Sequence, residues 1–306
     1  MTNKGEAMRS RFSSIATVIR LGGAGAMVVA GTLVLSGGSA MAAPSSKPMA
    51  YTCSGGALNL ANPPLSTFAD IPSGTYASIT VTGICDVAPN AVINVLGNFS
   101  VAAGAVFDAQ GAPSTITVKQ DLTGASGSIF ALGCLPNPPG HTTGHPCGTS
   151  LVGNTISNVD PLTASSNVTV NGNVVASNSN VVLLYGVTIK HNVVLTGGGG
   201  PVPIPWAIKD NSIGHDLVVS DMTPNWLGVL RNYIGHDANL TNIQITDGAF
   251  GDPNPTIFVA SNTVKHDLNC SGLGPAVAGG FPGEVNNVGH RATGQCANLP
   301  DVVPGG

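Results

Sequence analysis

The chain has 306 residues, a formal net charge of −4, 42% hydrophobic residues and only 8% charged residues. Typical soluble proteins have roughly 25% charged residues, so this composition argues against nucleic-acid binding, which needs a basic surface, and supplies few side chains for acid–base catalysis. The length suffices for one domain with a sizeable core.

The N-terminal segment has the pattern of a secretory signal peptide. An apolar run over 21–35 follows a basic region and precedes the small-residue motif Ala40-Met41-Ala42. The basic residues are Lys4, Arg9, Arg11 and Arg20. We therefore expect residues 1–42 to be a signal peptide and residues 43–50 a disordered linker. The apolar run is shorter than the roughly 20 residues of a membrane span, so we expect no span after cleavage, and a retained anchor is the alternative.

The next part of the chain reads as short strands separated by turns. Prolines interrupt residues 51–74, and we expect this segment to form an irregular cap. Over 76–132, short apolar and β-branched runs alternate with glycines, which is typical of strands. A Pro/Gly-rich loop follows at 134–147, and strands are expected to resume at 151–184. Residues 197–205 hold prolines that lack amide donors, so we expect a loop there.

A repeated phrase dominates the C-terminal half. It reads NSIGHDLVV in the copy that begins at Asn211, and a degenerate copy begins at Gly186. Aligned on their histidines, the copies place five residues at one position, at intervals of 21 to 30 residues: His191, His215, His236, His266 and His290. Self-similarity at such intervals indicates stacked repeats. We predict an all-β fold, a single parallel β-solenoid over residues 51–299 with disulfide-stapled ends, followed by a flexible tail at 300–306.

Two columns of turn residues follow from this stacking. We expect four asparagines to lie above one another at a corner, each amide bonding to the next coil: Asn211, Asn232, Asn262 and Asn286. The Gly-His-Asp step is expected to form a second corner, where Gly214, Gly235 and Gly289 suit a positive φ.

Six cysteines in an exported chain indicate three disulfides. Cys270 and Cys296 follow the histidine position in adjacent copies, so stacking brings them together. Proximity pairs the two cysteines of the 134–147 loop. The remaining pair would tie the first strand to the first coil. The expected pairs are Cys53–Cys85, Cys134–Cys147 and Cys270–Cys296.

The five histidines are candidates for metal binding or for coupled titration, because a corner would place imidazoles about 4.8 Å apart at the surface. A purely structural role is the alternative, and no catalytic residue, cofactor or bound metal is assigned. Asp216, Asp237 and Asp267 follow three histidines and could collect Ca²⁺ or serve the turn. The set Cys134, His141, His145 and Cys147 has zinc-like spacing, although oxidation to a disulfide is the reading that suits an exported chain.

The repeat phrase resembles secreted repeat proteins of actinobacteria and, more distantly, bactofilin-type repeats with G-[DN]-[ILV] corners. The matching positions begin at Gly214, Gly235 and Lys265, and the resemblance covers about 186–296. It implies a β-solenoid and no catalytic residue.

The expected function is that of a secreted or cell-envelope, non-enzymatic structural or adhesive protein. Its expected partner is a cell-wall or extracellular glycan, or a second copy. The alternatives are a polysaccharide-active β-helix lyase or hydrolase, and a metal- or glycan-binding module. The segment after residue 42 has only one glutamate, Glu284, and two arginines, which leaves little for a hydrolytic site. Four aromatic residues could form a sugar-stacking face or pack in the core: Tyr185, Trp206, Trp226 and Tyr233.

Overall fold

The computed structural model describes residues 47–59, 66–137, 144–151, 155–200, 202, 204–246, 255–280 and 284–299. The expected signal peptide and C-terminal tail lie outside these residues, as do positions 43–46 of the expected linker. Every regular element in the described part is a strand, and nothing in it forms an apolar helix of membrane-spanning length.

The strands form three parallel sheets. The first sheet contains β1 (Tyr51–Cys53), β4 (Ile79–Val81), β7 (Phe99–Val101), β10 (Leu122–Gly124), β13 (Val174–Ser177), β16 (Val193–Thr196), β19 (Leu217–Met222), β22 (Ala238–Gln244), β25 (Asp267–Gly274) and β28 (Arg291–Gly294). The second sheet contains β2 (Ala69–Ile71), β5 (Ile84–Val87), β8 (Val106–Ala109), β11 (Ile129–Leu132), β14 (Val181–Tyr185), β17 (Trp206–Lys209), β20 (Leu227–Leu230), β23 (Thr256–Ala260) and β26 (Ala276–Ala278). The third sheet contains β3 (Gly74–Tyr76), β6 (Val92–Val95), β9 (Thr115–Val118), β12 (Asn167–Val170), β15 (Val187–Ile189), β18 (Ser212–Ile213), β21 (Tyr233–Ile234), β24 (Thr263–Val264) and β27 (Asn287–Val288).

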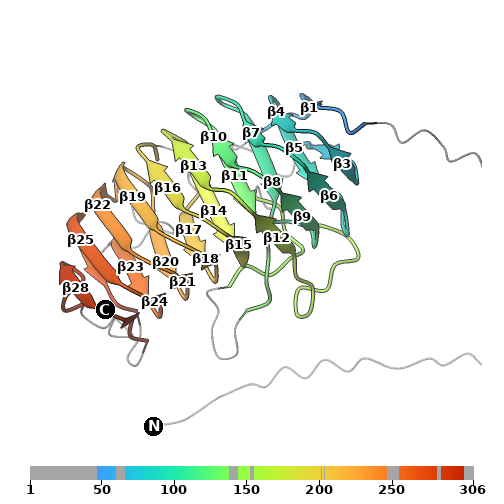
Figure 1. Ribbon diagram of the computed structural model, residues 1–306. Coiled ribbons are helices and arrows are strands. Elements are labelled where there is room, and N and C mark those ends of the chain that lie inside the picture. The colour runs from blue at the N-terminus through green and yellow to red at the C-terminus, as the bar shows by residue number, and fades with distance from the viewer. Residues whose placement is uncertain are drawn as a thin grey trace, which may run out of the picture. The chain divides into compact units, whose positions relative to one another are not determined.

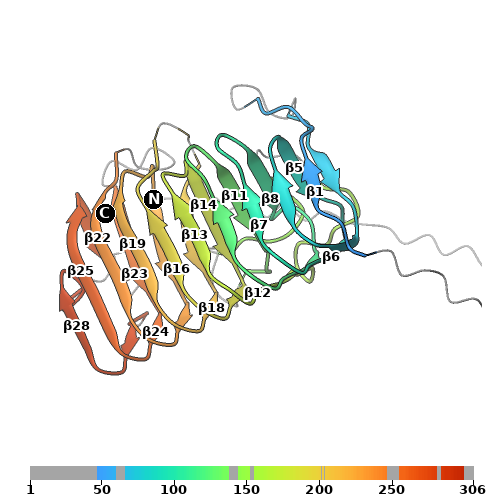
Figure 2. The ribbon, with the colours of Figure 1, turned by 45° about the horizontal axis from the view of Figure 1, so that its top comes forward.

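Successive strands visit the three sheets in turn, and each strand pairs in parallel with the strand three positions later (Figures 1 and 2). One pass through the three sheets is here called a rung. The predicted parallel β-solenoid is therefore confirmed. The degenerate copies before Gly186 belong to the same stack as the histidine-bearing copies, since β13 pairs with both β10 and β16.

The core lies between the three sheets. Inward-facing aliphatic and aromatic side chains fill it, and the rings of Phe99 and Phe107 pack with centroids 4.6 Å apart. Trp206 is 1% exposed, and its indole N–H donates to the carbonyl of Asn180 at 2.8 Å, so its one polar atom is satisfied. Burial of each such side chain contributes roughly 1.5–3 kcal/mol. A single rung cannot bury its own apolar side, so this stabilisation requires that the rungs stack.

The predicted asparagine column forms an Asn ladder, comprising Asn211, Asn232, Asn262 and Asn286, at the corner between the second and third sheets. The first three members are buried, and each Nδ2 donates at 2.9 Å to Oδ1 of the next member. The other amide hydrogen of Asn232 binds the carbonyl of Ile208. These bonds satisfy polar groups that would otherwise be costly to bury.

The expected positive φ at Gly214, Gly235 and Gly289 is wrong. The left-handed residues are the ones directly before three ladder asparagines: Asp210 (φ 58°), Arg231 (φ 54°) and Ser261 (φ 55°). Glycine is used at 214 for a different reason, because a Cβ there would lie 2.1 Å from the carbonyl oxygen of Lys190 in the rung below.

A second column, the Asx ladder, precedes the strands of the first sheet. In it the side-chain oxygen of each residue except the last accepts the backbone N–H of the equivalent residue one rung later, over distances of 2.7 to 3.2 Å. Its members are Asn98, Asp121, Asn173, Asn192, Asp216, Asp237 and Asp267. Each rung is thereby held in register with the next at this corner.

The three expected disulfides are present: Cys53–Cys85, Cys134–Cys147 and Cys270–Cys296. The first and third pairs lie near the two ends of the described stack, where an end rung has only one neighbour. No cysteine is free, which fits an oxidising compartment.

Two expectations about strand positions are wrong. Residues 51–74 were expected to be an irregular cap, yet they contain β1 and β2, which pair with β4 and β5. Strands were expected to resume at residue 151, but the described residues between β11 and β12 contain no strand, so the solenoid resumes at Asn167. The long segment between them is an insertion at a corner, which stacking tolerates.

Candidate functional sites

The five histidines form one column at the corner between the third and first sheets, as predicted. From His215 onward, the backbone N–H of each histidine donates to the carbonyl of the histidine one rung earlier, at 3.1 or 3.2 Å. All five are exposed. The rings of His236 and His266 are stacked, with centroids 5.0 Å apart and planes 5° from parallel. The expected position of the imidazoles at a surface corner is therefore confirmed.

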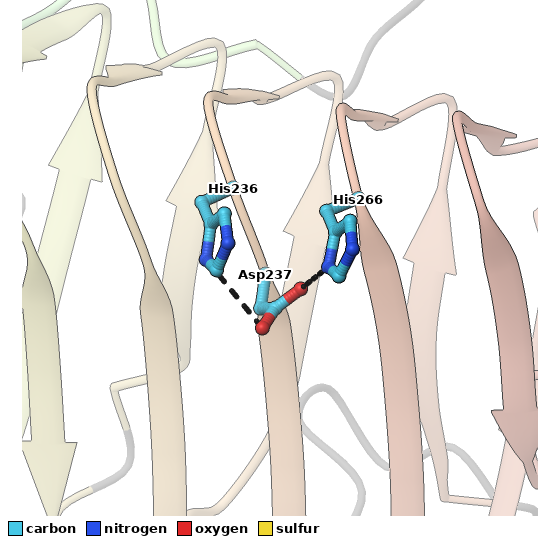
Figure 3. A group of neighbouring side chains, drawn as sticks. All are labelled: His236, Asp237 and His266. Carbon is cyan, nitrogen blue, oxygen red and sulfur yellow. Dashed lines mark hydrogen bonds and ion pairs between the residues drawn. The ribbon is translucent and has the colours of Figure 1, made fainter.

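Three of the histidines are paired with a carboxylate from the preceding rung. The distances between Nδ1 and Oδ1 are 2.7 Å for His236–Asp216, 2.7 Å for His266–Asp237 and 2.6 Å for His290–Asp267. An ionised carboxylate only accepts, so Nδ1 carries the proton in each pair. Figure 3 shows the carboxylate of Asp237 between the rings of His236 and His266.

Contacts between the histidines and aspartates of this column shift the pKa values of His236, Asp237 and Asp267 toward their charged forms. The hydrogen bond to Asp216, with the charge of Asp237, raises the pKa of His236 above its usual value. Burial acts to raise the pKa of Asp237, but the hydrogen bonds from the Asp267 amide and from His266 outweigh it and hold this pKa below the usual range. Asp267 shows the same balance, and its pKa is also lowered. These carboxylates are therefore ionised at neutral pH.

Two overlapping groups in the column have ligand atoms within 4.8 Å of one another. They are His236–Asp237–His266 and His266–Asp267–His290. Imidazole nitrogen and carboxylate oxygen suit borderline transition ions such as Zn²⁺. The aspartates do not form a Ca²⁺ cage of six to eight oxygens, because their Oδ1 atoms already accept hydrogen bonds and Asn192 and Arg291 interrupt the acidic series.

The zinc-like set in the 134–147 loop is not assembled as a metal site. Cys134 and Cys147 are bonded to each other, which removes both thiolates. His141 lies outside the described residues, and His145 packs against Tyr185 with ring centroids 4.9 Å apart.

A second candidate site is a groove on the outer face of the second sheet. Strands β8, β11, β14, β17 and β20 are buried along their whole length, so their outer faces are covered as well as the faces that line the core. Between this face and its cover lies a cavity of about 480 Å³, within the usual range of ligand sites. Its floor includes Tyr185, Lys209, Trp226, Leu230 and Phe258. The covering side chains include His145, Leu151, Ile204 and Glu284.

The floor of the groove is aromatic around one lysine. The ammonium of Lys209 lies 5.4 Å from the ring centroid of Tyr185 and 5.1 Å from that of Trp226. Burial, followed by the charge of Arg231, lowers the pKa of Lys209 to about 8, although Asp210 acts in the opposite direction. The same covered site gives Tyr185 a pKa above its usual value, chiefly through burial.

Other polar groups of the groove differ in charge and in whether their hydrogen bonds are satisfied. Arg231 forms a bidentate ion pair with Asp210, in which Nε donates to Oδ1 at 2.7 Å and Nη2 donates to Oδ2 at 2.8 Å. Burial, together with the charge of Lys209, lowers the pKa of His145 to about 4, so the ring is neutral at pH 7. Among the described residues, its Nε2 has no hydrogen-bond partner, and the same holds for both amide atoms of the buried Gln110. Unsatisfied buried atoms beside a cavity are places where a ligand or ordered water can bind.

The four aromatic residues that were candidates for a sugar-stacking face lie in different places. Tyr185 and Trp226 line the groove, Trp206 is in the core, and Tyr233 is 44% exposed on the third sheet. Sequence reasoning missed the groove because its parts come from separate rungs and insertions. A usable signal was the unbroken apolar run at 181–184, since strands covered on both faces lose their alternation.

Comparison with known proteins finds no matching family model, no matching curated protein and no matching solved structure. The resemblance of the repeat phrase to secreted repeat proteins therefore supports the β-solenoid fold alone, and function must be argued from the geometry.

Proposed function

We propose that this chain is an exported, non-enzymatic surface protein that binds a glycan in the groove of the second sheet. The observation that carries the proposal is the aromatic floor of the cavity around the half-buried Trp226. A Cβ on Gly228 would lie 2.3 Å from the Trp226 ring, so the indole lies directly against the bare backbone of β20. An aromatic face next to polar groups suits a sugar, which has an apolar face and hydroxyl edges.

The direction of the groove supports a linear ligand. The floor residues Tyr185, Lys209, Leu230 and Ala260 occupy equivalent positions in β14, β17, β20 and β23. Three steps between parallel strands correspond to about 14 Å along the stack. An oligosaccharide can therefore contact several rungs at once.

The third sheet supports a surface role in a different way. Its outward positions form an uncharged column in strand register, from Thr75 to Asn287. The members are Thr75, Asn94, Thr117, Thr169, Thr188, Ser212, Tyr233, Thr263 and Asn287. A regular uncharged column is suited to contact with a second copy of the chain rather than to chemistry.

Export is part of the proposal. It is supported by the signal-peptide pattern at 1–42 and by three disulfides, which persist in oxidising compartments. Cell fractionation with mass spectrometry of the mature N-terminus tests it. Protein recovered only from the cytoplasm, with residues 1–42 attached, would contradict it.

Binding is tested with the purified protein on a glycan array, followed by calorimetry with the best oligosaccharide. Trp226→Ala should lower the affinity at least about tenfold, the effect of losing a central aromatic contact. Tyr233→Ala is the matched control, because it removes an exposed aromatic ring outside the groove. Equal affinities for the two variants, or no glycan bound at all, would reject the proposal.

A polysaccharide lyase or hydrolase is the second candidate. It is favoured by the presence of Lys209, Arg231 and Glu284 in one groove, and by the pKa of about 8 at Lys209, which suits a general base. Binding remains the better supported role because Asp210 is held by Arg231 and does not offer a second acid opposite Glu284. Release of reducing or unsaturated ends from bound polysaccharide, abolished by Lys209→Met, would establish the enzyme instead.

A further inference from the structure

We propose that the histidine column holds one transition-metal ion per chain, with His266 as the shared ligand. The ion is completed by Asp237 and His236 on one side or by Asp267 and His290 on the other. Its chemical class is a borderline divalent ion such as Zn²⁺, Ni²⁺ or Cu²⁺, which imidazole and carboxylate ligands select. The column is separate from the groove, so this site is independent of glycan binding.

The distances among the first three ligands are already short. Asp237 Oδ1 lies 2.7 Å from His266 Nδ1, and Asp237 Oδ2 lies 3.5 Å from His236 Nδ1. All three ligand atoms lie within 4.8 Å of one another. Neighbouring ligand atoms around a tetrahedral zinc ion are separated by about 3.3 Å, so the ligand atoms must close by at most about 1.5 Å.

The side chains are free to make this small movement. The side chains of His236 and His266 are 53% and 48% exposed, so their rings can tilt without disturbing the core. Their backbones are fixed by the rung-to-rung bond from His266 N–H to the His236 carbonyl. A neutral imidazole carries one proton, and its transfer from Nδ1 to Nε2 frees the Nδ1 lone pair for the ion.

The column is limited to one ion because both ligand groups contain His266. Its Nδ1 lies 2.7 Å from Asp237 Oδ1 and 3.9 Å from Asp267 Oδ2, so one nitrogen faces both carboxylates. One lone pair binds one ion, and two divalent ions a single rung apart would also repel each other. The two arrangements therefore compete for the same ion.

The other two histidines provide an internal control. His191 and His215 are stacked with ring centroids 5.5 Å apart, but the Asx ladder residue in the rung before each is an asparagine, Asn173 or Asn192. A neutral amide replaces the carboxylate, so neither ring has an acidic partner from the preceding rung. We expect this part of the column not to hold the ion.

The test is calorimetric titration of untagged, chelator-treated full-length protein with NiCl₂ and with ZnCl₂. Wild type should bind one ion per chain. His266→Ala should weaken binding at least about tenfold, as loss of a ligand requires. His236→Ala and His290→Ala should each lower the affinity only by about twofold, because one of two competing arrangements remains. His215→Ala should bind like wild type.

Two further readouts keep the test decisive. Circular dichroism spectra of His266→Ala and His215→Ala without metal should match, and their Tm values should differ by only a few degrees, because both rings are exposed and an exposed pair such as His266–Asp237 contributes little to stability. The Cu²⁺ complex of wild type should show nitrogen hyperfine splitting in its electron paramagnetic resonance spectrum, and His266→Ala should lose it. No binding by wild type, two ions per chain, or equal binding by His266→Ala and wild type would each overturn the proposal.

Discussion

Asp237 and His266 belong to successive rungs and are joined by a 2.7 Å hydrogen bond between Oδ1 and Nδ1. The same Oδ1 atom also accepts the backbone N–H of Asp267 at 2.9 Å. One carboxylate oxygen thus serves both the Asx ladder and the histidine column. The ladder function needs an acceptor at this position, whereas the histidine pairing needs a charge.

The first prediction separates these two roles. Asp237→Asn should change the free energy of unfolding by less than about 0.5 kcal/mol, because an amide oxygen still accepts the Asp267 N–H, as Asn192 does for Asp216. Asp237→Ala should cost about 1–2 kcal/mol, since it leaves that N–H without its partner. Urea unfolding in the presence of a chelator measures both. A cost for Asp237→Asn as large as that for Asp237→Ala would show that the charge, not the acceptor, stabilises the corner.

The second prediction concerns the buried Asn ladder. Asn232→Ala removes bonds to Asn211, Asn262 and Ile208 at a site that is 1% exposed, and should cost about 3 kcal/mol or more. Asn286→Ala, at the partly exposed end of the ladder, should cost less because water can replace the lost amide. Chemical denaturation of the two variants provides the comparison, and equal costs would contradict the argument.

The repeat made the stack and the Asn ladder predictable, because identical phrases in register must place identical residues above one another. The disulfide Cys270–Cys296 followed from the same register. The repeat did not show which corner residue is left-handed, since φ depends on the path between sheets, and Asp210 rather than Gly214 takes the positive value. The Asx ladder in the N-terminal half was missed because Asn98 and Asp121 lack a recognisable phrase around them.

The groove could not be read from the sequence for a spatial reason. Its floor collects one residue from each of several strands, and its cover comes from corner insertions such as 144–151. Insertion lengths vary between rungs, so no period connects His145 to Tyr185 in sequence. The histidine column was predicted as five equal members, whereas the structure separates three acid-paired rings from His191 and His215.

The third prediction concerns an acidic column on the outer face of the second sheet, where Asp70, Asp86 and Asp108 are in register. Burial, then the hydrogen bond with Asp70 and the nearby negative charges, raises the pKa of Asp86 to about 8. The folded state therefore keeps a proton that the unfolded chain releases near pH 4. This contribution to stability is fully present below pH 4 and is lost as the pH rises through about 8.

Asp86→Asn should remove that pH dependence, because the amide stays neutral and can still donate to Asp70. The urea midpoint of wild type should fall relative to that of the variant between pH 4.5 and pH 8.5, with the variant the more stable protein at the higher pH. Parallel pH profiles for the two proteins would show that Asp86 titrates normally.

The last prediction uses the lysine in the groove. Lys209 has a pKa of about 8 in the folded protein, chiefly because it is buried, against a usual value of 10.5. The folded state therefore binds fewer protons than the unfolded state between these two values, so stability should rise as the pH increases from about 8 to about 10.5. The difference of about 2.5 pKa units corresponds to about 3 kcal/mol.

Lys209→Met keeps most of the apolar stem and removes the charge, so its stability should lack this rise. The contacts of the ammonium with Tyr185 and Trp226 offset part of the burial cost, by about 1 kcal/mol for each well-placed ring, which limits the gain of the variant at pH 7. Denaturation at pH 7 and pH 10.5 should show the wild-type minus variant difference change by about 2–3 kcal/mol in favour of wild type. A constant difference would mean that Lys209 titrates at its ordinary pKa, and the case for a general base in the groove would lose its support.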